Sequence, residues 1–257
     1  MSRLAIKKGK KKFIEDLNRE VKVSKPAHYY IEDVSRDFHC TDGIIKKSDL
    51  NKTGIVKTSK NKEYSILASD FIDDYRKIKR LAQIIPLKDI GAIIAATGIG
   101  PKSRVIDSGT GSGAVSLFLA RYSKEVITFD TNQEHLDIAK ANAKKLGIKN
   151  IRFRKADIKK GIKEKDADLF VLDIPDPWEA ADTLDKTVKI GGFIAVYSPT
   201  IPQTSDFVNK VKDNDSFLHI KTIEIIERRW EIDGRKVRPS GQEIGHSGFL
   251  TFVRKIR

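Results

Sequence analysis

The residues with the clearest chemical potential follow three short apolar runs that are typical of strands. The segment Arg104–Gly113 reads Arg-Val-Ile-Asp-Ser-Gly-Thr-Gly-Ser-Gly, so an apolar run leads directly into a glycine-rich turn. Asp130 ends the next apolar run, and Asp173 ends a later one. Ligands of open α/β sheets bind at the edge where the parallel strands end. We therefore expect the glycine turn and both carboxylates to belong to one ligand site.

The glycine turn is compatible with two kinds of cofactor. Gly109-x-Gly111-x-x-Ala114 satisfies the dinucleotide fingerprint, and Asp130 follows about 20 residues later, where an acidic residue holds ribose hydroxyls. Asp107, two residues before the first glycine, would repel a pyrophosphate but attract the sulfonium and ammonium groups of S-adenosylmethionine. This favours a methyltransferase over an NAD-dependent dehydrogenase. A tight turn that binds no ligand is a third interpretation.

Composition narrows the class of partner. The 257-residue chain has a formal net charge of +14, a pI of about 9.6 and 39% hydrophobic residues. The apolar content suffices for a packed core, and the surplus of Lys and Arg favours polyanions such as nucleic acid. A solvated basic surface explains the same surplus.

Other features concern compartment and metals. We expect no membrane span and no signal peptide, because no apolar run is long enough and the start is basic. Cys40 is the only cysteine, which rules out an intramolecular disulfide and favours a cytoplasmic location. The five histidines lack metal-ligand spacing, so no metal site is expected.

The N-terminal third differs in pattern from the rest. Residues 1–20 are rich in lysine and predict a mobile basic arm. Residues 21–75 contain short strand-like segments between turn residues, which predict a small β domain followed by a linker over Asp70–Tyr75. Within that domain, Ile55–Thr58 and Tyr64–Leu67 predict a hairpin.

Alternating strands and helices over residues 76–257 predict a catalytic domain with a parallel sheet covered on both faces. The expected strands are Arg104–Asp107, Val126–Asp130, Ile151–Arg154, Leu169–Asp173 and Phe193–Tyr197. The expected helices are Asp89–Thr97, Gly113–Ala120, Gln133–Leu146, Glu179–Val188 and Thr204–Val211. The last two strands, His219–Arg228 and Gly248–Arg254, have no helix between them and should pair antiparallel at the sheet's edge. The sequence thus predicts a Rossmann-like class I S-adenosylmethionine-dependent methyltransferase fold with a small N-terminal β domain.

Several motifs resemble those of the tRNA adenine-N1-methyltransferases that modify the T-loop. They are Asp42-Gly43, Lys79-Arg80-x-x-Gln83-Ile84-Ile85, Lys88-Asp89-Ile90-Gly91, Gly109-Thr110-Gly111-Ser112-Gly113, Pro175-Asp176-Pro177-Trp178, Ser198-Pro199-Thr200-x-x-Gln203, Arg228-Arg229-Trp230, Arg238-Pro239 and Gly245-His246-Ser247-Gly248-Phe249-Leu250. The glycine turn is common to the superfamily, whereas the Pro-Asp-Pro-Trp and C-terminal motifs are much more specific. The resemblance extends over almost the whole chain after about residue 38.

Two positions depart from the family's pattern. Pro86-Leu87-Lys88-Asp89 stands where the family usually has Tyr-Pro-Lys-Asp, so an aromatic group suited to stacking on the target base is missing. Ser108 replaces the usual alanine of the glycine motif, a small-for-small change that we expect to be harmless.

The resemblance implies methyl transfer from S-adenosylmethionine to N1 of adenine 58 in the T-loop of tRNA by a homotetramer. Whether adenine 57 is modified as well stays open. Asp173 stands at the position of the family's catalytic aspartate, where it would accept a hydrogen bond from the exocyclic amine and stabilise the cationic product. Alternatively, it caps a helix that begins near Pro177.

The resemblance and the glycine turn together give a set of candidate site residues. Those expected at the cofactor are Gln83, Asp107, Gly109, Thr110, Gly111, Ser112, Gly113, Asp130, Asp157 and Asp173. Gln83 is equally explained as a surface glutamine, and Asp157 as a turn cap. Candidate contacts with tRNA are Trp178, Arg229, Arg238 and His246. An indole packed under the sheet and a structural histidine are the alternatives for Trp178 and His246.

Two other functions stay open at this point. One is a methyltransferase that acts on another RNA, a protein or a small molecule. The other is a non-catalytic tRNA-binding subunit. Five intact residues of the glycine turn and the strand ends argue against the second, since a non-catalytic subunit has no physical need for all five: Gly109, Gly111, Gly113, Asp130 and Asp173.

Overall fold

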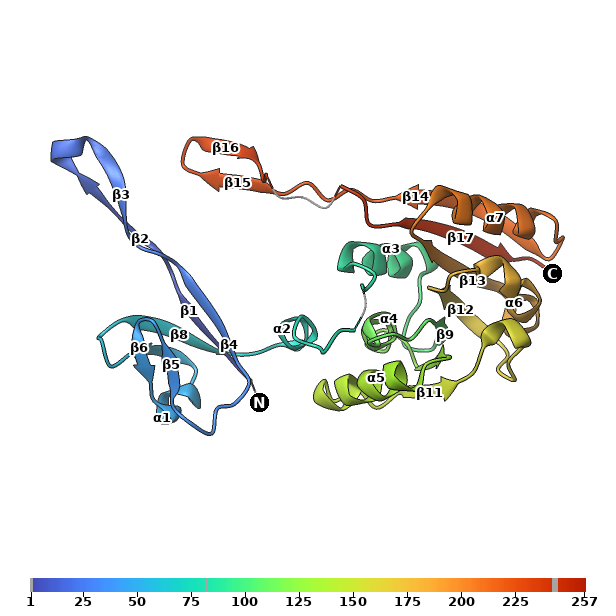
Figure 1. Ribbon diagram of the computed structural model, residues 1–257, viewed down its shortest axis with the longest axis horizontal. Coiled ribbons are helices and arrows are strands. Elements are labelled where there is room, and N and C mark those ends of the chain that lie inside the picture. Colours follow the sequence, from blue (N-terminus) through green and yellow to red (C-terminus); the bar gives the residue numbers. More distant parts are fainter. Residues whose placement is uncertain (1, 82, 242–244) are drawn as a thin grey trace. The chain divides into compact units, whose positions relative to one another are not determined.

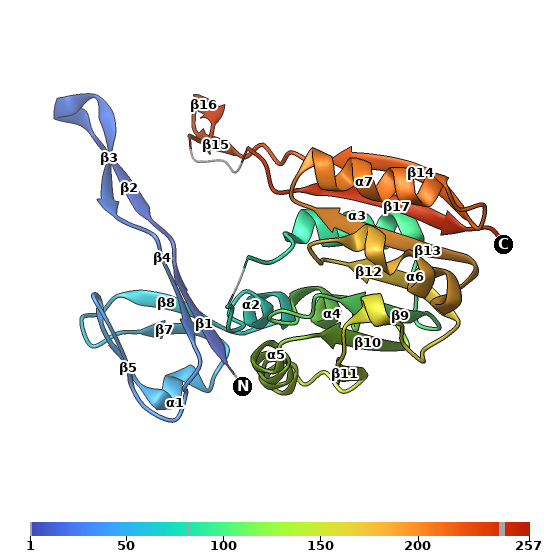
Figure 2. The same cartoon turned by 45° about the vertical axis from the view of Figure 1, so that its right-hand side comes forward.

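Two units, Met1–Lys77 and Ile78–Arg257, each enclose hydrophobic cores of their own. The computed structural model describes residues 2–81, 83–241 and 245–257. Figures 1 and 2 show the elements of both units. The division after Lys77 falls two residues beyond the boundary expected at residue 75.

A seven-stranded mixed sheet with strand order β11-β10-β9-β12-β13-β17-β14 forms the larger unit. The strands are β9 (Arg104–Ser108), β10 (Glu125–Asp130), β11 (Ile151–Lys155), β12 (Ala167–Leu172), β13 (Val188–Ser198), β14 (Phe217–Glu224) and β17 (Phe249–Lys255). The first five are parallel, and β17 runs antiparallel between β13 and β14. This topology confirms the predicted fold class and the antiparallel C-terminal pair. Because the strand order reverses between β9 and β12, a ligand is expected at their carboxyl ends.

Five helices accompany these strands, as the sequence predicts. They are α3 (Leu87–Thr97), α4 (Ala114–Leu119), α5 (Gln133–Lys145), α6 (Ala181–Thr187) and α7 (Ile201–Lys212), with short 3₁₀ turns η2 (Ile158–Lys160) and η3 (Pro177–Ala180). Helix α3 precedes the first strand, and the other four connect successive strands. The helix expected from Glu179 begins later, because η3 precedes it, and Val188 already belongs to β13. No helix in the described part of the chain is long and apolar enough to cross a bilayer.

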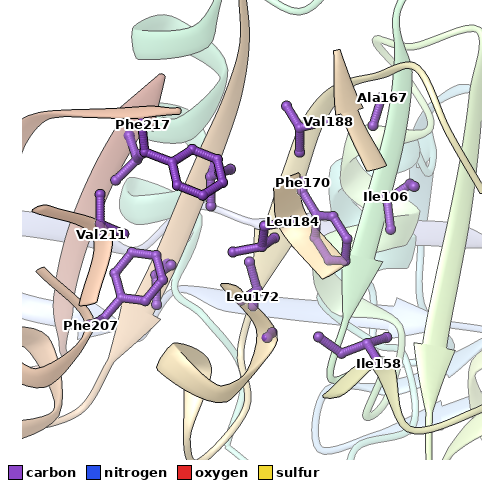
Figure 3. Packing of buried hydrophobic residues seen from close by; sticks show 14 of the residues in the cluster. Ile106, Ile158, Ala167, Phe170, Leu172, Leu184, Val188, Phe207, Val211 and Phe217 are labelled. Carbon is purple, nitrogen blue, oxygen red and sulfur yellow. The ribbon is translucent and has the colours of Figure 1, made fainter. Parts of the chain in front are cut away.

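Side-chain alternation along the central strands supplies two cores, one on each face of the sheet. Ile106 and Phe170 pack with Leu184 of α6 and Phe207 of α7 in one core (Figure 3). The neighbouring residues on the same strands, such as Val105 and Val171, pack in the other core, with residues of α3 and α4. Full burial of one such side chain contributes about 1.5–3 kcal/mol, so the sheet is held firmly from both faces. The loops at its edge therefore start from fixed positions.

The smaller unit contains a four-stranded antiparallel sheet of order β4-β1-β8-β7. The strands are β1 (Arg3–Lys7), β4 (Ala27–Ile31), β7 (Gly54–Lys57) and β8 (Glu63–Ala68), and β7–β8 confirms the predicted hairpin. The prediction of a mobile arm over residues 1–20 is wrong. β1 lies inside this sheet, paired with β4 and β8, and it buries Leu4 and Ala5. Met1, where the predicted arm begins, lies outside the described residues.

The remaining elements are short. They are β2 (Lys10–Ile14), η1 (Glu15–Leu17), β3 (Arg19–Ser24), β5 (Phe38–Cys40), β6 (Gly43–Ile45), α1 (Lys47–Leu50), α2 (Phe71–Tyr75), β15 (Trp230–Asp233) and β16 (Lys236–Pro239). The linker expected over residues 70–75 is largely helical, because Asp70 and Asp73 form a capping box at the start of α2, and Tyr75 is buried. The strand expected to reach Arg228 ends at Glu224.

Candidate functional site

A cavity of about 510 Å³ lies at the carboxyl ends of β9, β10 and β12. Eight of the ten residues expected at the cofactor line it: Gln83, Gly109, Thr110, Gly111, Ser112, Asp130, Asp157 and Asp173. Asp107 and Gly113 do not line it. The structure therefore brings the glycine turn and the carboxylates together at the edge of the sheet where the sequence predicts a ligand.

The glycine turn depends on the absence of side chains. Gly109, Gly111 and Gly113 have φ angles of 88°, 50° and 81°, in the region that favours glycine. A Cβ atom on Gly109 would lie 2.0 Å from the carbonyl oxygen of Asp173. The amide of Asp173 in turn donates to the carbonyl of Ser108 at 2.8 Å. The first glycine thus allows the loop after β12 to approach the turn after β9.

Asp130 is fixed by the turn that it faces. Its Oδ2 accepts a hydrogen bond from the amide of Gly111 at 2.9 Å, and its Oδ1 accepts one from the amide of Asn132 at 2.8 Å. His135 Nδ1 lies 3.1 Å from Oδ2. The side chain of Asp130 is 9% exposed and borders the cavity. A carboxylate held in this way is ready to accept hydrogen bonds from a vicinal diol.

The prediction that the carboxyl of Asp107 contacts the cofactor is not met by the structure. β9 continues through Ser108, so Asp107 is still inside the sheet and is completely buried. Its Oδ2 accepts a hydrogen bond from Thr128 Oγ1 at 2.6 Å, and Thr128 Oγ1 lies 2.7 Å from Thr110 Oγ1. Burial raises the pKa of Asp107 to about 7. Asp107 therefore lies beneath the glycine turn, where its carboxyl would not face a bound pyrophosphate.

Asp173 borders the cavity from the loop after β12. Burial raises the pKa of its carboxyl to about 6, so it is ionised above that pH and carries a proton more often than a surface aspartate below it. The alternative that Asp173 caps the next helical turn does not hold, because Asp176 is the residue that precedes η3. The carboxyl of Asp173 is therefore available to a ligand.

The motif Ser198-Pro199-Thr200-x-x-Gln203 acts on this loop. Thr200 Oγ1 caps α7, accepting a hydrogen bond from the Gln203 amide at 3.4 Å. The same hydroxyl donates to Gln203 Oε1 at 2.7 Å, and Gln203 Nε2 donates to the carbonyl of Pro175 at 3.0 Å. Gln203 thereby anchors the loop two residues beyond Asp173. Nothing in the sequence pattern alone indicates this contact.

Asp157 combines its two expected roles. Its side chain accepts a hydrogen bond from the Lys159 amide at 3.1 Å and so caps η2, while the residue also borders the cavity. Lys159, which the sequence analysis missed, borders the cavity as well, and its Nζ lies 3.1 Å from Asp176 Oδ2 and 2.8 Å from Glu179 Oε2. These carboxylates raise the pKa of Lys159, with Glu179 contributing most. The only sequence signal for Lys159 is its closeness to Asp157.

None of the four residues expected to contact tRNA lines the cavity. Trp178 is half-buried and packs against the core beneath the sheet, as its structural alternative predicts. Arg229 precedes β15 and Arg238 lies in β16, and every residue of these two strands is exposed. Arg229 Nε donates to Glu227 Oε1 at 2.8 Å, and Arg238 Nε donates to Glu231 Oε2 at 2.9 Å.

His246 lies between two acceptors. Its Nδ1 is 2.6 Å from Glu224 Oε1, and its Nε2 is 2.9 Å from the carbonyl oxygen of Pro199. These two contacts, Glu224 first, raise the pKa of His246. Only the imidazolium can donate to both partners at once. This arrangement corresponds to the structural alternative for His246.

In the parts of the chain that the structure describes, there is no group of three or more His, Cys, Asp or Glu side chains suited to a metal ion. The cavity itself presents backbone amides, carboxylates and apolar side chains, among them Ile84, Val115 and Phe129. Such a lining suits an organic ligand with both polar and aromatic parts.

The family model described as "tRNA methyltransferase complex GCD14 subunit" matches residues 76–245 of the chain. The chain is similar to a tRNA (adenine(57)-N(1)/adenine(58)-N(1))-methyltransferase of Methanocaldococcus jannaschii, with 32% identity over 82% of this chain and 86% of the relative. It is also similar to a tRNA (adenine(58)-N(1))-methyltransferase of Thermus thermophilus, with 29% identity over 85% of this chain and 88% of the relative.

A solved structure with the same architecture is a SAM-dependent O-methyltransferase of Thermotoga maritima. The TM-score is 0.81 at 28% identity, and the alignment covers 99% of this chain and 93% of the other. The likeness therefore includes both units, and not only the sheet that carries the cavity.

Proposed function

The chain belongs to the tRNA methyltransferase complex GCD14 subunit family, and from this premise we propose that it transfers a methyl group from S-adenosylmethionine to N1 of adenine 58 in the T-loop of tRNA. The observation that carries the proposal is the cavity in which the glycine turn, Asp130 and Asp173 meet. The name of the Methanocaldococcus jannaschii relative includes adenine 57, which supports this neighbouring adenine as a second target.

The cavity fits the cofactor in size and chemistry. A Cβ atom on Gly111 would meet no other residue closer than 3.8 Å, so the turn leaves open space for a ligand beside its backbone. Asp130 would hold the ribose hydroxyls, Asp157 the adenine of the cofactor, and Gln83 its methionine moiety. When bound, S-adenosylmethionine supplies a methyl group attached to a positively charged sulfur.

Asp173 is the catalytic residue of the proposal. Adenine N1 has a lone pair but is weakly basic, and methylation leaves the base with a positive charge. The site therefore needs orientation and charge stabilisation rather than a strong base. Ionised Asp173 would accept a hydrogen bond from the exocyclic amine, which aligns N1, and would stabilise the charge that grows on the ring. Gln203 holds the loop that carries this carboxylate.

We further propose that the protein is a cytoplasmic homotetramer that binds tRNA without a metal ion. Exposed apolar side chains on the β15–β16 hairpin support self-association, since Trp230, Ile232 and Val237 are 54%, 75% and 55% exposed. Arg229 and Arg238 beside them are candidate contacts with tRNA phosphates. Light scattering should give four times the 28.9 kDa mass of one chain.

The test is methylation of unmodified tRNA with a labelled methyl donor, followed by mass spectrometry of the nucleosides. We expect 1-methyladenosine in the T-loop, and calorimetry should give binding of S-adenosylmethionine that NAD does not displace. Asp173→Ala should lower turnover on the order of 100-fold, because one electrostatic contact in the transition state is lost, with little change in cofactor affinity.

Asp182→Ala is the control, since Asp182 is an exposed aspartate of α6 that does not line the cavity. It should change turnover far less than Asp173→Ala. Label on a different nucleoside, or normal turnover of Asp173→Ala, would contradict the proposed reaction or the role of Asp173, respectively.

A further inference from the structure

The lysine-rich start of the chain forms a two-stranded ribbon. β2 and β3 pair antiparallel and continue the β1–β4 ladder beyond Gly9 (Figures 1 and 2). A Cβ atom on Gly9 would lie 3.1 Å from both the ring of Pro26 and the carbonyl oxygen of Ser24, so the two strands approach closely at this point. Residues 7–25 contain eight Lys or Arg residues and three acidic residues. Neither β2 nor β3 has a buried residue.

The register of the ribbon gives it two different faces. Lys11 is directly opposite Lys22, and Phe13 is directly opposite Glu20. Alternation along β2 places Lys11 and Phe13 on one side, and the 3.7 Å contact between Lys11 Nζ and Glu20 Oε2 agrees with this arrangement. We call the face made by Lys11, Phe13, Glu20 and Lys22 the lysine-pair face.

The opposite face is built differently. There Lys12 is opposite Val21, and Ile14 is opposite Arg19, so each cation faces an apolar residue. Val21 and Ile14 are half-buried. We call this the mixed face.

The lysine-pair face places two lysines directly opposite each other, and its one carboxylate, Glu20, lies 3.7 Å from Lys11 Nζ, so the face keeps a net positive charge. Like charges directly opposite each other in a ladder are destabilising, and an isolated two-stranded ribbon is marginally stable to begin with. Phe13 on the same face is 53% exposed. A bound polyanion resolves both features, because phosphates neutralise the paired ammonium groups and the ring finds a base or ribose to pack on.

From these features we infer that the lysine-pair face of the β2–β3 ribbon binds the phosphate backbone of RNA. The inference rests on the proposed function, and the lysine-pair face would bind tRNA at a distance from the reacting base, outside the cavity. Recognition of this kind positions the substrate without reading its sequence, since the contacts go to phosphates.

Two matched variants test the assignment in the full-length protein. Lys11→Gln with Lys22→Gln removes two positive charges from the lysine-pair face, and Lys12→Gln with Arg19→Gln removes two from the mixed face. Affinity for unmodified tRNA is measured by filter binding over a range of salt concentrations. We expect the first variant to lose affinity on the order of tenfold at 0.1 M salt and its salt slope to fall by about 1.5, as for two lost phosphate contacts.

The second variant should keep nearly the wild-type affinity and slope. Equal losses in both variants would overturn the assignment in favour of diffuse attraction by the whole ribbon, and unchanged binding in the first would exclude the face. The melting temperature should change little in the first variant, because the change removes both a like-charge pair and the exposed contact between Lys11 and Glu20.

Failure of the proposed function gives a different result. In that case the wild-type protein would leave tRNA unmethylated, whatever the ribbon binds. If the proposed function holds, the first variant should still methylate tRNA at the wild-type rate when tRNA is saturating.

Discussion

Asp173 shows how a single burial effect sets the pH range of the proposed reaction. Burial raises the pKa of its carboxyl to about 6, and only the ionised form can stabilise a cationic base. The value of kcat/KM should therefore rise between pH 5 and pH 7 with the loss of one proton and level off above. A pH–rate profile under single-turnover conditions measures this directly.

Asp107 is the control for that assignment. Its pKa is also raised, to about 7, but it lies beneath the glycine turn and does not border the cavity. In the Asp107→Asn variant, the rise of kcat/KM near pH 6 (the step) should persist. Disappearance of the step in this variant would assign it to Asp107 instead of Asp173.

Gly109 is the glycine whose replacement should do most damage. An added Cβ would lie 2.0 Å from the carbonyl oxygen of Asp173, at a φ of 88° that L side chains rarely adopt. Gly109→Ala should lower the free energy of unfolding by about 2 kcal/mol or more. It should also displace the loop after β12 that carries Asp173, which we call the catalytic loop. Thermal and urea denaturation, with turnover measured in parallel, give both effects.

Gly91 provides the comparison for Gly109. It lies in α3, where an added Cβ would meet nothing within 4 Å. Gly91→Ala should raise stability by up to about 1 kcal/mol through helix propensity. Similar losses in the two variants would mean that the close approach of the two loops is not what requires glycine at residue 109.

At the residue scale, most of the residues that line the cavity could be predicted from the sequence, but how deeply each side chain is buried could not. The spacing of the glycines and the strand-end position of Asp130 follow from local rules, and the cavity agrees with them. The strand β9 extends one residue further than predicted, through Ser108, and this buries Asp107. The hydrophobic pattern does not predict the end of a strand to a single residue. His135 and Lys159 were missed because their places depend on where a helix or turn begins.

At the scale of elements, α7 is coupled to the catalytic loop by one side chain. Gln203 Nε2 donates to the carbonyl of Pro175 at 3.0 Å. Gln203→Ala should slow methyl transfer by roughly fivefold, since a hydrogen bond of about 1 kcal/mol that orders the loop is lost, while stability changes little. Single-turnover methylation and thermal denaturation separate the two effects.

Asn209→Ala serves as the control on the same helix, because Asn209 is exposed. Turnover should be unchanged in this variant. Thr200→Ala should lower stability as well as turnover, because Thr200 both caps α7 and contacts Gln203. A Gln203→Ala enzyme as fast as the wild type would show that the loop needs no support from α7.

The elements of the sheet were predictable for a physical reason. Buried parallel strands are short apolar runs between helices, and each run is recognisable without its partners. β1 is the opposite case, because Arg3–Lys7 owes its place to pairing with β4 and with β8, about 25 and 60 residues further along the chain. A five-residue strand of this kind gives little local signal, and the lysines that follow it suggested an arm.

At the scale of the whole molecule, the two units have separate cores, so damage to one should leave the other folded. The cofactor cavity is built from residues after Ile78. The proposed grip on tRNA, in contrast, depends on the ribbon that extends from the N-terminal sheet. Substrate binding and cofactor binding should therefore be separable by mutation.

Deletion of residues 1–12 tests this separation and the role of β1 together. β1 lies between β4 and β8, and Ala5 belongs to the small core, so its loss should unfold the N-terminal unit instead of merely removing charge. Replacement of residues 10–24 by Asn-Gly should remove the ribbon and spare the sheet. Limited proteolysis should cut the first variant throughout residues 13–77 and leave the second intact. Calorimetry should give wild-type affinity for S-adenosylmethionine in both, and a resistant N-terminal unit in the first variant would contradict the structural role of β1.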